Sequence, residues 1–341
     1  MRNLSSAPRL AVTLLALPGL AGAQPAGPPQ GGAPEDFANV EIHTLKTQGH
    51  VFMLVGAGGN ISVQVGKDGV LMVDAEYPQL SGKILAAIRR ISDGPIRYIV
   101  NTHYHADHTS GNQNLRKVGS TIAGGNVAGD LGAEASEGAS VIAHNNVLGR
   151  MSGALGKAAA MPQDAWPTDT YVGDEKKLWF NDEGVEIIHV PSAHTDGDSI
   201  VYFRKSDVIS TGDLFVTTSY PIIDVAAGGT INGYLDGLQK IVDLIVPVYG
   251  QEGGTLVIPG HGRLCDLGDV LNYREMATII RDRVQDMIKK GMTLEQVKAA
   301  KPTFDYDPLY GTTTGFWTTD RFVEAVYQTL LPNKERGDGK K

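Results

Sequence analysis

Between residues 40 and 100 the chain consists mainly of short apolar runs, most of them with the two-residue period of a β-strand. Some runs alternate apolar with polar side chains, and others are almost continuously apolar, as in strands that are buried on both faces. The predicted strands of this part are 40–45, 51–55, 61–65, 70–73 and 97–100. One helix is expected at 81–91, where Ile84, Leu85, Ile88 and Ile91 recur at helical spacing.

Strand-like runs alternate with helical patterns over the rest of the chain. The further predicted strands are 120–123, 141–143, 177–180, 185–190, 200–203, 208–210 and 256–258. The further predicted helices are one from 145, then 231–246, 270–290, one from 293, and 319–331. This alternation is typical of a layered α/β fold in which helices cover the faces of sheets. From about residue 266 only helical patterns remain, which predicts a helical C-terminal part.

The N-terminal residues 1–23 have the pattern of a cleavable signal peptide. Arg2 and Arg9 precede the apolar stretch Leu10–Leu20, and Ala21-Gly22-Ala23 provides small residues for a cleavage site. The apolar stretch is short and contains Pro18 and Gly19, so it is not expected to span a bilayer. We therefore expect cleavage near Ala23 and a secreted or periplasmic protein, the alternative being a cytosolic protein with an unstructured start.

Composition sets the limits of the folded unit. Residues 24–36 form a leader with four Pro and three Gly, a composition that builds no core, and 332–341 form a charged tail. The remaining residues, 37–331, are predicted to fold as a single domain. No later segment is apolar for long enough to span a membrane, so no stable membrane insertion is expected after cleavage.

Charge and cysteine content exclude several classes of function. The formal net charge is −8, and it becomes −10 once residues 1–23, with two arginines and no acid, are removed. Such a balance argues against nucleic acid or an anionic membrane surface as the main partner. The expected partner is a small-molecule substrate. Cys265 is the only cysteine, so the chain forms no intramolecular disulfide. The oligomeric state does not follow from the sequence.

A cluster of potential metal ligands follows the strand 97–100. His103, His105, Asp107 and His108 lie within six residues of one another in the loop that opens at Asn101. Loops at the carboxyl ends of strands are where α/β folds place ligands. Imidazole nitrogens and a carboxylate are ligands that zinc prefers. The spacing lets His103 and His105 point the same way, with Asp107 and His108 directed to a neighbouring point.

The same pattern recurs further along the chain. An apolar strand ends, and a loop opens with histidine or aspartate, at His103, His194, Asp213 and His261. Because strand ends meet at one edge of a packed sheet, these loops are expected to converge despite their separation in sequence. The sequence therefore predicts a metal site at that edge.

Taken together, the His-x-His-x-Asp-His loop and the loops of His194, Asp213 and Pro-Gly-His261-Gly resemble the metallo-β-lactamase superfamily of hydrolases. The resemblance spans about residues 40–262. It implies a four-layer αβ/βα sandwich, in which two mixed sheets pack face to face with helices outside. The helical part after residue 266 would be an addition to this fold. Those helices could cover the site, mediate dimerisation or complete the outer layer.

The resemblance also implies a set of metal ligands and two Zn²⁺ ions per chain, with iron or manganese as alternatives. His103, His105 and His194 would bind one ion, and Asp107, His108 and His261 the second. Asp213 would bridge the two ions. Asp107 would in addition be the catalytic residue that orients the nucleophile or accepts its proton. Asp74, at the end of the strand 70–73, resembles the buried aspartate that supports the metal-binding loop in this superfamily.

The expected activity is hydrolysis of an ester, lactone, thioester or amide-type bond by a metal-bound hydroxide. Secreted β-lactamases of the superfamily commonly carry Cys or Ser at the position of Asp213. This difference argues against a β-lactamase, so β-lactam hydrolysis is the second hypothesis. The tyrosine expected in quorum-quenching lactonases three residues after the bridging aspartate is replaced by Val216. A third hypothesis is a di-iron redox protein, because the same ligands also suit iron.

Overall fold

The computed structural model describes residues 36–121, 138–156, 159–245 and 254–332. The predicted signal peptide lies outside the described residues, as do nearly all of the predicted leader and charged tail. The predicted strand 120–123 lies partly outside them, and Ser120 forms only an isolated bridge with Gly138.

The first sheet contains seven strands in the order β1-β2-β3-β4-β5-β6-β7. They are β1 His43–Lys46, β2 Val51–Val55, β3 Ile61–Gly66, β4 Gly69–Val73, β5 Ile96–Val100, β6 Ser140–His144 and β7 Asp169–Tyr171. The strands β1 to β4 pair antiparallel through short turns, and β4 to β7 pair parallel. The parallel strands need helical connections, which places helices on the outer face of this sheet.

The second sheet contains five strands in the order β12-β11-β10-β9-β8. They are β8 Glu175–Phe180, β9 Glu183–Val190, β10 Asp198–Phe203, β11 Val208–Ser210 and β12 Leu256–Ile258. The strands predicted at 177–180 and 185–190 leave four residues between them, but only Asn181 and Asp182 lie between β8 and β9. Their φ values of 53° and 60° are the left-handed conformation that two-residue hairpin turns require.

The helices connect and cover these sheets. The α-helices are α1 Ser81–Arg89, α2 Ala106–Thr109, α3 Asn112–Lys117, α4 Asn145–Met151, α5 Ile231–Leu244, α6 Leu267–Lys289, α7 Leu294–Ala299, α8 Asp307–Tyr310 and α9 Thr319–Leu330. The 3₁₀ turns are η1 Phe37–Asn39, η2 Pro78–Leu80, η5 Gln163–Ala165, η6 Gly212–Leu214 and η7 Val225–Ala227. None of the described helices is both long and apolar enough to cross a membrane.

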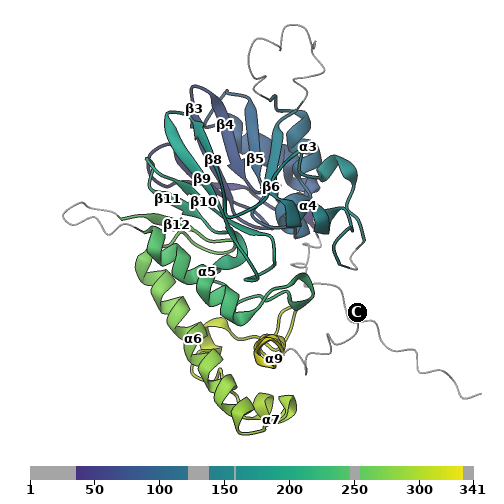
Figure 1. Ribbon diagram of the computed structural model, residues 1–341. Coiled ribbons are helices and arrows are strands. Elements are labelled where there is room, and N and C mark those ends of the chain that lie inside the picture. Colours follow the sequence, from purple (N-terminus) through teal and green to yellow (C-terminus); the bar gives the residue numbers. More distant parts are fainter. Residues whose placement is uncertain (1–35, 122–137, 157–158, 246–253, 333–341) are drawn as a thin grey trace, which may run out of the picture.

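The two sheets and their helices form four layers, as the resemblance implied (Figure 1). Side chains such as Val51, Leu71, Val201 and Phe203 fill the space between the sheets. A second cluster packs α1 and α3 on the outer face of the first sheet. A third packs α5 on the outer face of the second sheet and joins it to α6 and α9. Burial of apolar side chains on both faces explains why β4 is buried at every position.

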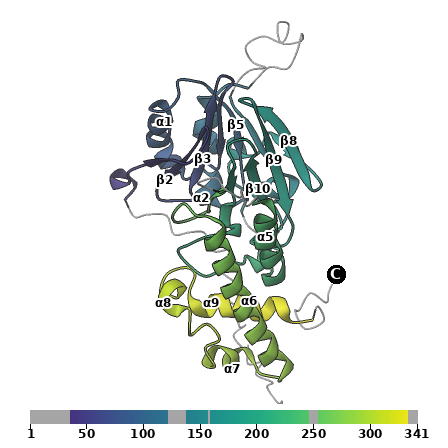
Figure 2. The ribbon, with the colours of Figure 1, turned by 90° about the vertical axis from the view of Figure 1, so that its left-hand side faces the viewer.

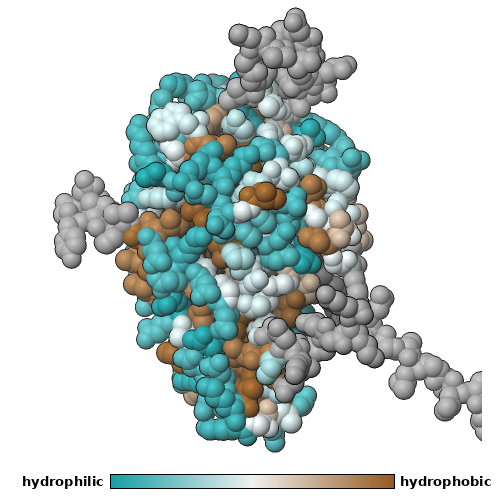
Figure 3. Space-filling view, viewed as in Figure 1, coloured by the Kyte–Doolittle hydropathy of each residue, from teal (hydrophilic) through white to brown (hydrophobic). Residues whose placement is uncertain are grey.

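The C-terminal helices extend beyond the sandwich at one end (Figure 2). α6 begins with a capping box in which Asp266 and Asp269 bind each other's backbone N–H groups. Its buried face packs against α5 and α9. The outward faces of these helices are mostly hydrophilic, with apolar patches between them (Figure 3). The predicted helix 231–246 ends earlier, at Leu244.

Candidate metal centre

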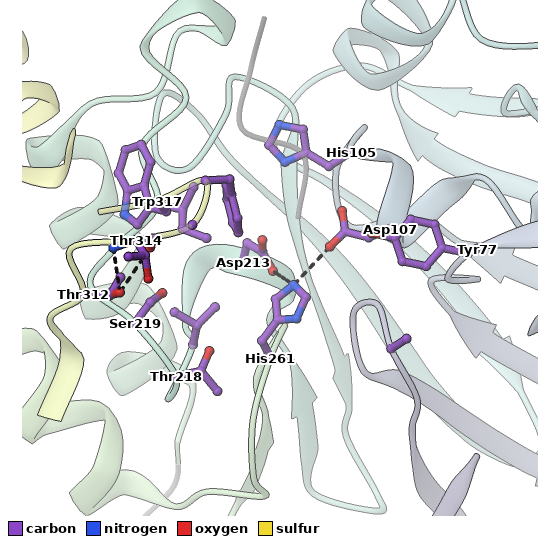
Figure 4. A pocket seen from close by; sticks show the side chains of 15 residues that line it. Tyr77, His105, Asp107, Asp213, Thr218, Ser219, His261, Thr312, Thr314 and Trp317 are labelled. Atoms are coloured by element: carbon purple, nitrogen blue, oxygen red, sulfur yellow. Dashed lines mark hydrogen bonds and ion pairs between the residues drawn. The ribbon is translucent and has the colours of Figure 1, made fainter. Parts of the chain in front are cut away.

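Four loops meet at one edge of the sandwich, between the two sheets. β5 leads into the loop that carries His103, His105 and Asp107, and the turn between β9 and β10 carries His194. Asp213 lies in the 3₁₀ turn after β11, and His261 lies in the loop after β12. Figure 4 shows His105, Asp107, Asp213 and His261 directed into a common space.

All seven residues predicted as metal ligands are brought together in two adjoining groups. Within each group, one ligand atom from every residue lies within 4.8 Å of the others. The groups are His103, His105, His194 and Asp213 on one side, and Asp107, His108 and His261 on the other. Six of the seven are buried, and only the His261 side chain is partly exposed, at 24%.

Asp213 lies between the two groups and offers one oxygen to each. Its Oδ2 is 3.9 Å from His103 Nε2 and 3.7 Å from His194 Nε2. Its Oδ1 is 3.2 Å from His108 Nε2 and 3.5 Å from His261 Nε2. A carboxylate in this position can serve both halves of a two-ion site, as the resemblance implied.

Hydrogen bonds from the surrounding protein orient the imidazoles on the first loop. Asp74 accepts from the Thr102 backbone N–H at 2.8 Å and from its hydroxyl at 2.7 Å. The same carboxylate lies 2.8 Å from His108 Nδ1, and the Thr102 hydroxyl lies 3.0 Å from His103 Nδ1. Each of these Nδ1 atoms is therefore occupied, and each Nε2 faces the centre. The left-handed backbone of Asp74, at φ 65°, turns its side chain under the loop.

Two other histidines are held in the same way from the opposite side. His105 Nε2 lies 3.1 Å from Asp224 Oδ2, an oxygen that also accepts from the Tyr104 hydroxyl at 2.6 Å. His194 Nδ1 lies 2.7 Å from the Ile222 carbonyl, which fixes Nδ1 as the donor. The remaining nitrogens, His105 Nδ1 and His194 Nε2, face each other at 2.9 Å. Hydrogen bonds of this kind on the outer nitrogen are what metal-binding histidines require.

The donor atoms fit a metal centre better than a closed polar network. Among the candidate ligand atoms, His103 Nε2 is buried with no hydrogen-bond partner. Unpaired polar atoms at such depth are costly unless something else binds them. Five imidazoles and two carboxylates, with the inner nitrogens turned to one space, match the preferences of zinc and of related divalent ions.

On the side of His103 and His194, burial keeps the imidazoles in the neutral form that can bind a metal ion. Burial lowers the pKa of His103 well below its ordinary value and that of His194 to about 4, so both rings are neutral near pH 7. Burial alone would raise the pKa of Asp213, but His261 and His108 hold it well below the ordinary range. The pKa of His108 is correspondingly raised, because Asp213, Asp107 and Asp74 outweigh its burial.

Two buried acids of the site were not singled out in the sequence. Asp224, which holds His105 and Tyr104, follows the apolar residues 221–223; an acid that ends an apolar run was the only signal available. Glu76 is fully buried with φ 52°, and its Oε2 accepts from the N–H groups of Ala57 and Gly58. Burial raises the pKa of Glu76, an effect that these two hydrogen bonds oppose.

Glu76 supports the centre through the loop 56–60. Within that loop the Gly59 N–H donates to the Asp107 carbonyl at 3.0 Å. The Asn60 side chain donates to the Pro259 carbonyl at 2.9 Å, two residues before His261. The loop therefore ties the segment of Asp107 to the segment of His261 across the two sheets.

Three further side chains, those of His144, Trp166 and Tyr220, have structural roles. His144 accepts from the Asn146 N–H at the start of α4, and its ring stacks on His189 at 3.7 Å. The Trp166 indole donates to the Met161 carbonyl at 2.9 Å and so fixes its own loop. The Tyr220 hydroxyl donates to Asp307 at 2.8 Å, and its ring stacks on Phe322.

A cleft of about 350 Å³ opens beside the ligand cluster. One side of it is formed by His105, Asp107, Asp213 and His261. Its apolar lining is provided by Val216, Ile222, Phe316 and Trp317. Figure 4 shows Trp317 and Thr314 facing the metal-ligand residues across this space. The arrangement can hold a small molecule with its reacting bond at the clustered ligands.

Comparisons with known proteins agree with this geometry. A family model described as "Metallo-beta-lactamase superfamily" matches residues 54–261. A linear primary-alkylsulfatase from Pseudomonas sp. (strain ATCC 19151) is 26% identical over 297 residues, which cover 77% of this chain and 54% of that protein.

Solved structures show the same fold. The sec-alkylsulfatase Pisa1 from Pseudomonas sp. matches 84% of this chain and 50% of its own, with a TM-score of 0.57 and 14% identity. A metallo-beta-lactamase from Pontibacter korlensis matches 70% of this chain and 99% of its own, with a TM-score of 0.51 and 14% identity. This chain thus spans about half the length of the alkylsulfatases that it matches.

Proposed function

Because the chain belongs to the metallo-beta-lactamase superfamily of metal-dependent hydrolases, we propose that it is a dinuclear zinc enzyme that cleaves an ester-type bond of a small molecule. The bond would be that of an ester, lactone, thioester or amide. Water adds to the acyl carbon, and the alcohol, thiol or amine leaves with the second proton.

The observation that carries this proposal is the pair of ligand groups joined by Asp213. His103, His105 and His194 would hold one ion, and Asp107, His108 and His261 the other. Two such ions supply a water made acidic enough to be a nucleophile near pH 7 and a Lewis acid for the reacting oxygen. The hydrogen bonds to Asp74, Thr102, Asp224 and the Ile222 carbonyl occupy the outer nitrogens and aim the inner nitrogens at the centre.

Asp107 is assigned the catalytic role. It lines the cleft, and its Oδ2 lies 3.3 Å from His261 Nε2 and 3.6 Å from His108 Nε2. Burial alone would raise its pKa, but His108 and His261 keep the pKa below its ordinary value. The group is therefore a carboxylate at neutral pH, able to orient an attacking water or accept its proton.

A second candidate is hydrolysis of an alkyl sulfate ester. It is supported by the relative named as a linear primary-alkylsulfatase and by the apolar side of the cleft, against which an alkyl chain could lie. β-Lactam hydrolysis and di-iron redox chemistry are the further alternatives. The pattern of residues 1–23 supports action outside the cytoplasm, in the periplasm or after secretion.

Elemental analysis of the purified, unchelated protein tests the proposal. Asp213→Ala and His261→Ala are compared with wild type, and His43→Ala, an exposed histidine outside the site, serves as control. About two zinc ions per chain, reduced in the two site variants only, are expected. Iron with a visible absorption band would indicate redox chemistry. No stoichiometric metal under any loading condition would refute the proposal.

Substrate assays then separate the candidates. The zinc-loaded protein is offered 4-nitrophenyl acetate, a lactone, a thioester, octyl sulfate and a chromogenic β-lactam, each with and without chelator. Chelator-sensitive turnover of the acyl compounds supports the main proposal. Release of sulfate at a higher kcat/KM would favour the second candidate instead.

A further inference from the structure

One wall of the cleft is formed by residues beyond the part of the chain that matches the family. The match ends at residue 261, whereas Thr312, Thr314, Phe316 and Trp317 line the cleft. These four residues lie in the connection between α8 and α9. The helical C-terminus therefore covers the site, which was one of the three roles left open by the sequence.

Hydrogen bonds within the connection hold it in one shape. The Thr319 N–H donates to the Thr312 carbonyl at 2.9 Å, and the Thr312 N–H donates to the Thr319 hydroxyl at 3.1 Å. Arg321 donates to the Phe316 carbonyl. Gly315, at φ 87°, makes the turn that presents Phe316. The segment is thus a closed loop with both ends fixed at the base of α9.

The loop is also anchored to the body of the protein. Trp317 is 8% exposed and belongs to the core cluster around α5, α6 and α9. Its indole N–H donates to the Pro221 carbonyl at 3.2 Å. Tyr220, the preceding residue, stacks on Phe322 with ring centroids 4.7 Å apart and donates to Asp307. The wall is therefore a built part of the site.

The chemistry of the wall is apolar and without positive charge. Phe316 and Trp317 provide its apolar side chains, and Val216 and Ile222, which lie within the matched part of the chain, extend this apolar lining. No lysine or arginine is among the described residues that line the cleft. Arg263, two residues after His261, is paired with Asp269 through two hydrogen bonds and lines a different cavity. A substrate carboxylate placed against this wall, away from the candidate metal ligands, would lose its hydration without gaining a cationic partner.

We propose that the wall of Val216, Ile222, Phe316 and Trp317 is a subsite for an uncharged alkyl or aryl group of the substrate. The reacting bond of that substrate would lie at Asp107, Asp213 and His261, on the other side of the cleft. This inference rests on the proposed function for its kinetic consequences. The substrate class is accordingly a neutral ester or thioester with an apolar acyl group.

The first test is a series of 4-nitrophenyl esters with the zinc-loaded protein. From acetate to butyrate to hexanoate, kcat/KM is expected to rise by up to about fourfold for each added methylene, the equivalent of about 0.8 kcal/mol. The 4-nitrophenyl hemisuccinate, which ends in a carboxylate, is expected to react on the order of tenfold more slowly than the butyrate or worse. Rates independent of chain length, or a hemisuccinate as good as the butyrate, would overturn the proposal.

Two pairs of variants locate the effect at the wall. Phe316→Ala should reduce the hexanoate-to-acetate ratio of kcat/KM by on the order of tenfold, and Thr313→Ala should not change it. Thr313 is exposed in the same loop but lines a different cavity. Thr314→Lys should raise the hemisuccinate-to-butyrate ratio, and Thr313→Lys should not. If Phe316→Ala slows every ester by the same factor, its role is only structural and the subsite is refuted.

A binding measurement distinguishes failure of the subsite from failure of the proposed function. 1-Hexanol is titrated calorimetrically into wild type, Phe316→Ala and Thr313→Ala. Weaker binding to Phe316→Ala alone supports the subsite even if no ester is hydrolysed, an outcome that counts against the proposed function only. Equal binding to all three proteins would refute the subsite even where esters are hydrolysed.

Discussion

Replacing Asp224 with asparagine gives the sharpest test of how the metal centre is built. Among the candidate metal ligands, Asp224 forms a hydrogen bond with His105. In its buried position it accepts three hydrogen bonds in total. Its Oδ2 binds the Tyr104 hydroxyl at 2.6 Å and His105 Nε2 at 3.1 Å, and its Oδ1 binds the Ala227 N–H at 3.0 Å. The variant keeps the size of the side chain and changes one acceptor into a donor.

The magnitude follows from this hydrogen-bond geometry. The amide has one oxygen, so either Ala227 or the pair of Tyr104 and His105 faces an NH₂ group. A buried donor left without an acceptor costs about 1–3 kcal/mol. If the NH₂ group faces His105, the proton of that ring moves to Nδ1, the nitrogen that lies 2.9 Å from His194 Nε2 in the centre. We expect affinity for the ion at His103, His105 and His194 to fall by about 10- to 100-fold.

Competition with a chromophoric chelator measures this loss. The metal-free protein is titrated with zinc in the presence of the chelator, and the two stoichiometric steps are fitted separately. Asp196→Asn is the matched control, because Asp196 lies near the site but binds Arg150 through hydrogen bonds of 2.7 Å and 3.0 Å. The control should bind zinc as wild type does. Wild-type affinity in Asp224→Asn would show that the outer hydrogen bond does not tune this site.

Two further predictions concern packing and pH. Gly59→Ala should reduce metal affinity on the order of tenfold or more, because a Cβ at Gly59 would overlap the His108 ring; the same chelator assay checks it. Gly82→Ala, with open space around it, should leave affinity unchanged and stabilise the fold by about 0.5 kcal/mol. Burial and His189 lower the pKa of His144 to about 4. The unfolded state therefore binds a proton first as pH falls from about 6.5 to 4, and this opposes folding by up to about 3 kcal/mol. His144→Asn keeps an acceptor for the start of α4, so urea unfolding of the metal-free protein should show a smaller loss of stability over that range.

The seven candidate ligand positions could be predicted because their signals are local. His103, His105, Asp107 and His108 follow one strand within a few residues, and three further strands end in histidine or aspartate. The period-two runs located most strands, and strand ends converge in any packed sheet. The sandwich itself was implied by the resemblance, since strand and helix patterns alone are compatible with several layered folds.

The supporting residues could not be predicted because their roles depend on contacts between distant segments. Asp224 binds His105 across 119 residues, and Glu76 binds Gly58 in the loop 56–60 across 18 residues. Asp74 and Glu76 both adopt left-handed backbone conformations. The residue types Asp and Glu alone do not predict such a conformation. An isolated acid after an apolar run is common. Only the tertiary structure determines which of these acids forms a hydrogen bond with a histidine of the site.

The C-terminal part shows the same limit in a different form. Its helices could be predicted from their apolar faces, but an apolar face packs equally well on a sheet, on a cleft or on a second copy. The position of the C-terminal part is fixed at two consecutive carbonyls. Trp317 donates a hydrogen bond to the Pro221 carbonyl, and His194 donates one to the Ile222 carbonyl. The segment that would choose the substrate and the segment that would orient a metal ligand are therefore joined at two consecutive peptide units. A chain that changed its substrate by altering the loop 312–317 would have to keep the carbonyl of Ile222 in place, which favours substitution at Phe316 over substitution at Trp317.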